Sequence, residues 1–202
     1  MKKFLQSAPI SGARLRARLL LSILLSSLAA GATEATKIER YEVKAPHAGV
    51  PAGGARTKVV APAGVVRAVV TDYKNYTAII TRFDKARVVG RSGDKTDVYL
   101  EVPIMKRAAK IWAVVRFDPP KIVDGVELVV GRMLQGNVKR LDATWRIRRV
   151  DDRHSQLELE LSIVPHLPLP SALIVSEERY AAARGVDGVR KEAEKRHGRA
   201  TN

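Results

Sequence analysis

Residues 163–180 read Ile-Val-Pro-His-Leu-Pro-Leu-Pro-Ser-Ala-Leu-Ile-Val-Ser-Glu-Glu-Arg-Tyr, and this stretch says more about the fold than any other. An alternating strand ends at Val164, and prolines punctuate the corner that follows it. Ser171 suits the N-cap of a long helix that runs from Pro170 to about His197. A long helix after a run of strands can cover one face of a sheet and close a pocket.

The residues before this corner predict an antiparallel meander. Between residues 84 and 164 the apolar residues recur with a period of two, and short turns join consecutive segments. Leu141, Ala143 and Trp145 share one face of a strand whose other face carries Asp142 and Thr144, as a sheet with one wet side requires. The expected strands cover residues 84–91, 96–102, 111–117, 126–133, 141–150 and 156–164.

A shorter pattern precedes the meander. A strand at residues 56–61 is followed by Pro62-Ala-Gly64, a helical stretch over 65–71, a turn over 72–76 and a second short helix. The order is therefore strand, two short helices, a run of about six strands and one long helix. It predicts an α+β helix-grip fold, in which a curved antiparallel sheet of six or seven strands wraps around the last helix.

This order resembles the START-like superfamily, also called SRPBCC, and within it the polyketide cyclase/dehydrase and coenzyme Q-binding branch. The matching residues are Val59-Val-Ala-Pro-Ala-Gly-Val-Val-Arg-Ala-Val-Val-Thr-Asp-Tyr-Lys-Asn-Tyr76, the segment 136–145 and the corner 165–170. One departure is that residues 77–83, Thr-Ala-Ile-Ile-Thr-Arg-Phe, lack the proline usual in that branch. The resemblance covers about residues 56–196.

The resemblance implies a cavity between the helix and the sheet that holds a lipid, a quinone or a polyketide-like molecule. An apolar ligand needs an apolar wall with a few polar groups that orient it. The candidates combine apolar bulk with occasional polar tips, although ordinary core packing explains each of them equally well. These candidate ligand-binding residues are Tyr73, Tyr76, Met105, Trp112, Met133, Trp145, Leu161, Leu173 and Tyr180.

The amino-terminal residues indicate a secretory leader. Basic residues precede an apolar run over 19–32 that is shorter than a membrane-spanning helix needs, and Ala30-Gly-Ala32 supplies a cleavage site. An uncleaved anchor or an organellar transit peptide remains the alternative. We expect a signal peptide at 1–32, a linker with at most one short strand at 33–55, the ligand-binding domain at 56–197, a disordered tail at 198–202, and a periplasmic or secreted location.

Charge and composition limit the partners. Removal of the leader's five basic residues lowers the formal net charge from +15 to +10. This positive charge suits peripheral contact with an anionic membrane surface; the alternative is a solvated basic surface that has no specific role. Aromatic residues make up 5% of the chain and do not interleave with the basic clusters, so no nucleic acid is expected.

Catalytic motifs are missing from the sequence. There is no cysteine, the four histidines are isolated, and no nucleophile elbow or phosphate loop occurs, so we expect no metal and no cofactor. Strand arginines, if one points inward, could pair with an anionic head group. The alternative to a carrier is a cyclase, dehydratase or isomerase in which Tyr73, Tyr76 or His166 transfers protons, and it rests on family analogy alone.

Overall fold

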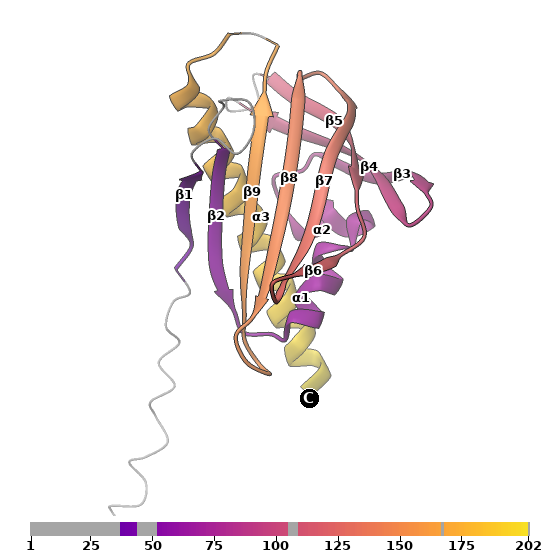
Figure 1. The fold of residues 1–202 in the computed structure, drawn as a ribbon, viewed down its shortest axis with the longest axis vertical. Coiled ribbons are helices and arrows are strands. Elements are labelled where there is room, and N and C mark those ends of the chain that lie inside the picture. Colours follow the sequence, from indigo (N-terminus) through magenta and orange to yellow (C-terminus); the bar gives the residue numbers. More distant parts are fainter. Residues whose placement is uncertain (1–36, 44–51, 105–108, 167, 202) are drawn as a thin grey trace, which may run out of the picture. The chain divides into compact units, whose positions relative to one another are not determined.

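An antiparallel sheet of nine strands and a long carboxy-terminal helix dominate the part of the chain that the computed structural model describes, residues 37–43, 52–104, 109–166 and 168–201 (Figure 1). The expected α+β helix-grip fold is confirmed, with more strands than the six or seven expected. In chain order the elements are β1 (Glu39–Val43), β2 (Ala52–Val59), α1 (Ala63–Val70), the single-turn helix η1 (Tyr73–Asn75), α2 (Tyr76–Ile79), β3 (Lys85–Ser92), β4 (Lys95–Ile104), β5 (Ala109–Phe117), β6 (Lys121–Val123), β7 (Val126–Gly136), β8 (Arg140–Arg149), β9 (Ser155–Val164) and α3 (Ser171–Thr201).

The sheet runs in the order β1-β2-β9-β8-β7-β5-β4-β3, and the short strand β6 pairs with β7. The crossover between β2 and β9 places the first long strand beside the last one. Register shifts between Val88 and Gly90 and between Val114 and Val115 interrupt two of the ladders. Such irregularities increase the local twist and bend a sheet, and a bent sheet can surround a helix.

The alternation read in β8 and β9 is confirmed by their register. Trp145 pairs with Leu159, and Ala143 pairs with Leu161, so the apolar residues of both strands share the inner face. Helix α3 lies along this face, against β2 and β9 (Figure 1). Burial of these apolar side chains between helix and sheet is the main force that holds α3 in place.

The small helices fill one end of the space inside the sheet. Val66, Val69 and Val70 of α1 are fully buried, and the ring of Tyr73 stacks on Phe117 with 4.6 Å between the ring centroids. The carboxy-terminal half of α3 packs against the same cluster through Val186, Val189 and other small residues. The core is therefore solid beneath this half of the helix.

Two boundaries differ from the prediction. Residues 52–55, expected in a linker, begin β2, because Gly53 and Gly54 serve close packing rather than a loop. A Cβ on Gly53 would lie 2.4 Å from the Cβ of Glu178, and one on Gly54 would lie 2.6 Å from the ring of Tyr41. Residues 198–201, expected in a disordered tail, continue α3 as helix to Thr201. The predicted signal peptide at 1–32 lies outside the described residues.

Candidate functional site

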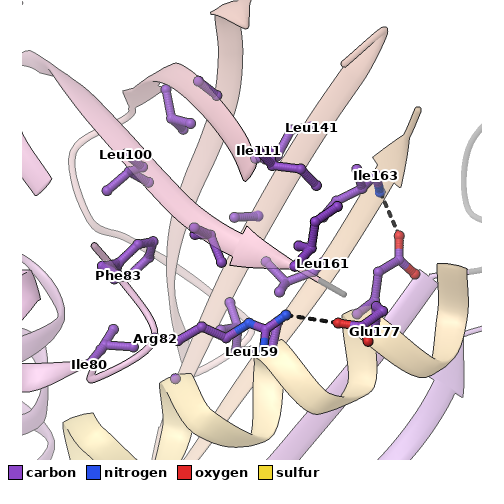
Figure 2. Close-up of a pocket in the computed structure, with 18 of the residues that line it drawn as sticks. Ile80, Arg82, Phe83, Leu100, Ile111, Leu141, Leu159, Leu161, Ile163 and Glu177 are labelled. Atoms are coloured by element: carbon purple, nitrogen blue, oxygen red, sulfur yellow. Dashed lines mark hydrogen bonds and ion pairs between the residues drawn. The ribbon is translucent and has the colours of Figure 1, made fainter. Parts of the chain in front are cut away.

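A cavity of about 170 Å³ lies beneath the amino-terminal half of α3, opposite the solid end of the core. Figure 2 shows apolar side chains from the loop after α2 and from the strands converging on it, with Glu177 of α3 beside them. Most of the side chains in its wall are aliphatic or aromatic. They include Ile80, Phe83, Leu100, Val102, Ile104, Ile111, Ala113, Leu141, Ala143, Trp145, Leu159, Leu161, Ile163, Leu169, Leu173, Ile174 and Ala181.

Helical spacing explains why α3 contributes a continuous stripe to this wall. Ile174, Glu178, Ala181 and Gly185 line the cavity and recur every three or four residues, so they lie on one face of the helix. The residues of this stripe become small toward Gly185, where the helix comes close to the sheet. A Cβ on Gly185 would lie 2.7 Å from the Cδ2 atom of Leu159. The cavity ends where the helix and sheet meet.

A buried carboxyl group belongs to this stripe. Glu178 is 1% exposed, and its two oxygens accept hydrogen bonds from the backbone N–H groups of Gly53 (2.9 Å) and Ile163 (2.6 Å). Burial raises the pKa of Glu178 to about 7, and the two backbone donors oppose that rise. The carboxyl group therefore joins α3 to the ends of β2 and β9 and titrates near neutral pH.

A second charged pair borders the cavity. Arg82, in the loop after α2, donates from Nη2 to Oε2 of Glu177 on α3 at 2.8 Å (Figure 2). The Arg82 side chain is 14% exposed, whereas that of Glu177 is 41% exposed. The guanidinium also lies over the ring of Tyr180, 4.8 Å from its centroid. This pair thus ties the loop to the helix at the edge of an apolar space.

Four of the predicted ligand-binding residues lie in the cavity wall: Tyr76, Trp145, Leu161 and Leu173. Their role as ligand contacts stays a prediction. The Tyr76 hydroxyl already donates to the carbonyl oxygen of Val70 at 2.5 Å, and burial raises its pKa well above the ordinary value. Tyr76 therefore offers its ring to a ligand rather than its hydroxyl group.

Four others lie outside the wall. Trp112 alternates with Ile111 and Ala113, which line the cavity, so it lies on the opposite face of β5, where it stacks with Tyr99. Tyr73 is buried against Phe117 in the solid part of the core.

Met133 packs against the core without reaching the cavity, and Tyr180 is 42% exposed on the outer side of α3. Met105 lies outside the described residues.

Sequence reasoning missed the charged residues of the wall. Among the strand arginines considered for a head group, Arg116 pairs with Asp97 and Arg132 with Asp118, both away from the cavity. The arginine that does line it, Arg82, comes from a loop whose placement no periodicity predicts. The sequence did contain a clue to the position of Glu178, because this residue interrupts the apolar stripe of α3 at a position that faces inward.

Solved structures with a similar architecture are known. The chain matches a STAR-related lipid transfer protein from Xanthomonas axonopodis with a TM-score of 0.65 and 14% identity, over 77% of this chain and 93% of that one. Human StAR-related lipid transfer protein 5 matches with a TM-score of 0.65 and 10% identity, over 90% and 94%. A Streptomyces aromatase/cyclase matches with a TM-score of 0.57 and 20% identity, over 79% and 96%.

The chain has the START-like fold. Because these identities are low, the likeness shows the fold alone and leaves the ligand open. No protein-family model and no curated protein matches the sequence. Within the described ranges, no helix of the START-like domain has the length and apolarity of a membrane span, and no group of side chains is arranged to hold a metal ion.

Proposed function

We propose that this START-like chain binds a hydrophobic small molecule in the cavity beneath α3 and carries it without chemical change. The observation that carries the proposal is the cavity itself, an almost entirely apolar space between α3 and the sheet. Two of the structural neighbours are named as lipid transfer proteins. The leader-like residues 1–32 support a periplasmic or secreted carrier.

The size of the cavity limits what it encloses. Its volume of about 170 Å³ is close to that of a dry engineered cavity of about 150 Å³ that binds benzene. A single ring or the end of an acyl chain therefore fits within the wall, and the rest of a larger lipid would extend through the opening. We propose a ligand that is small, or one that is held by its apolar end.

A cavity-filling variant tests this proposal. Ala143→Leu adds bulk to the wall on β8, whereas Arg148→Leu changes an exposed residue of the same strand and serves as the matched control. Saturating benzene should raise the unfolding temperature of the wild type and of Arg148→Leu, because a ligand that binds only the folded state stabilises it. The increase should be lost in Ala143→Leu. Equal increases in all three proteins, or none in the wild type, would contradict binding in this cavity.

A cyclase, dehydratase or isomerase is the second candidate, and Glu178 is the observation in its favour. A carboxyl group with a pKa of about 7 in an apolar wall is suited to general acid–base chemistry. Against this, both Glu178 oxygens are engaged by backbone N–H groups, and His166 is exposed outside the wall. Turnover of a bound molecule by the wild type that is abolished in Glu178→Gln, with binding retained, would favour the enzyme over the carrier.

A further inference from the structure

Three ionisable side chains with charged forms at neutral pH line the described part of the cavity: Arg82, Glu177 and Glu178. Glu178 uses both oxygens on backbone N–H groups. Glu177 lies on the solvent side and accepts from Arg82. Among these groups, Arg82 is the one with donor capacity left for a ligand.

Within the Arg82 side chain, the Nε atom is the donor that lacks an acceptor in the described part of the chain. It is buried, and no acceptor within the described residues forms a hydrogen bond with it, while Nη2 is bound to Glu177. Buried polar groups in proteins nearly always have a hydrogen-bond partner, because an unpaired one has lost its water without compensation. An oxygen atom of a molecule in the cavity would supply the missing acceptor.

The charges around Arg82 indicate whether this oxygen belongs to an anionic group or to a neutral one. Glu177 already neutralises the guanidinium, and Glu178 places a second carboxyl group in the same wall. The nearby cations are directed elsewhere: Arg40 lies 5.8 Å from the centroid of the Tyr180 ring, and Arg184 is an exposed residue that donates to the Thr81 hydroxyl. An anionic ligand would therefore meet a guanidinium that Glu177 already neutralises and a Glu178 carboxyl group that is partly ionised near neutral pH, whereas a neutral acceptor avoids this repulsion.

We infer that the ligand is a neutral apolar molecule with a carbonyl oxygen, and that this oxygen accepts a hydrogen bond from Nε of Arg82. Ketones, esters and quinone-like rings have this chemistry, and fatty-acid anions do not. The inference rests on the proposed binding function and names the class of ligand. Arg82 is then the residue that determines specificity in an otherwise apolar wall.

The test compares three eight-carbon molecules on the full-length protein by isothermal titration calorimetry: methyl hexyl ketone, n-octane and octanoate. Each ligand is compared between the wild type and Arg82→Met, because in a direct comparison of ketone with alkane the loss of water from the carbonyl group offsets the hydrogen bond. The ketone should bind about tenfold more weakly to Arg82→Met, which corresponds to one hydrogen bond to a charged donor, and n-octane should bind equally to both proteins. In the wild type, the ketone should bind more tightly than octanoate. An equal change for ketone and alkane, or a preference for octanoate, would overturn the assignment.

Two variants locate the effect. Arg82→Met keeps an apolar side chain and removes the donors, so the affinity for the ketone should fall while the affinity for n-octane is retained. Arg184→Met removes a neighbouring cation that does not line the cavity and should keep the wild-type affinity for both molecules. A ketone affinity that is unchanged in Arg82→Met would refute the role of Arg82.

A measurement on the wild type avoids dependence on the stability of the variants. The Nε–H resonance of Arg82 in nitrogen-detected NMR should shift when methyl hexyl ketone binds and change much less with n-octane. If the ketone binds and the resonance does not move, the hydrogen bond is refuted although the carrier function stands. If none of the three molecules binds, the proposed function itself fails.

Discussion

Glu178 shows how a single residue can be misread when a helix is known only from its sequence. Ser176-Glu-Glu-Arg179 has the composition of a solvated helix face, and Glu177 is indeed 41% exposed. Glu178 differs because Gly53 allows the backbones of β2 and α3 to approach, so that the carboxyl group accepts from the N–H groups of Gly53 in β2 and Ile163 in β9. Its burial is therefore a property of the contact of α3 with these two strands.

The raised pKa of Glu178 predicts the pH dependence of folding. Its ordinary value is 4.5 and its value in the fold is about 7, so the folded state binds the proton more tightly than the unfolded state does. The contribution of this group to stability is full below pH 4.5 and is lost as the pH rises toward 7. Relative to Glu178→Gln, the wild type should lose on the order of 2 kcal/mol of unfolding free energy across this range.

Urea unfolding at several pH values would measure this difference. Glu177→Gln, which keeps the buried carboxyl group, should retain the wild-type pH dependence. If the wild type instead gains stability with pH relative to Glu178→Gln, the backbone donors outweigh burial and the pKa is not raised.

At the level of elements, close contact of α3 with its neighbours depends on glycine. Glycine inside a helix marks either a kink or a close approach to a neighbouring element, and α3 contains Gly185 and Gly188. The structure has one continuous helix in which both glycines face tightly packed neighbours. A Cβ on Gly188 would lie 2.2 Å from the carbonyl oxygen of Ile79. Glycine at these positions lowers the helix propensity of α3 but allows the helix to contact its neighbours closely.

Two alanine substitutions in the same helix should therefore have opposite effects. Gly188→Ala should destabilise the protein by about 1–3 kcal/mol, because the carbonyl group of Ile79 cannot yield as a flexible side chain can. Gly198→Ala, where the added methyl group meets no described atom within 4 Å other than the backbone of its own helix, should stabilise it by up to about 1 kcal/mol through propensity alone. Chemical denaturation of the two variants tests this. Equal effects would mean that packing does not decide the role of Gly188.

For the whole molecule, the excess of basic residues is the feature that the cavity does not explain. The chain has 36 Lys and Arg residues against 21 Asp and Glu residues. Ion pairs such as Arg116 with Asp97 and Arg190 with Asp187 neutralise part of the positive charge. The remaining excess is attractive to an anionic surface, which is where a carrier of apolar molecules would load and release them.

Vesicle binding tests this expectation. The full-length protein should bind vesicles that contain phosphatidylglycerol and show much weaker binding to vesicles of phosphatidylcholine alone. The binding should fall at least about tenfold when the salt concentration rises from roughly 0.1 M to 0.5 M, because salt screens surface charges. Equal binding to both lipids in a cosedimentation assay, or binding that does not change with salt, would argue against electrostatic contact.

Local patterns were sufficient for most of the architecture. A period of two in residues 141–164 predicted β8, β9 and their inner face, because side chains alternate strictly along a strand. The proline corner and Ser171 predicted where α3 begins. The three-residue strand β6 was missed, because so short a segment has no measurable period. The glycines of β2 were taken for a linker, since glycine has the same sequence signature in a loop and at a tight contact.

The sequence by itself therefore determined the order of the elements, the inner face of β8 and β9 and the expectation of a cavity under the last helix. Only the packed molecule determined which residues surround that cavity. Tyr76 and Trp145 reach it, Tyr73 fills the core, and Arg82 enters the wall from a loop. The physical reason is that periodicity assigns a side chain to a face, whereas a cavity wall is formed by contacts between segments far apart in the chain.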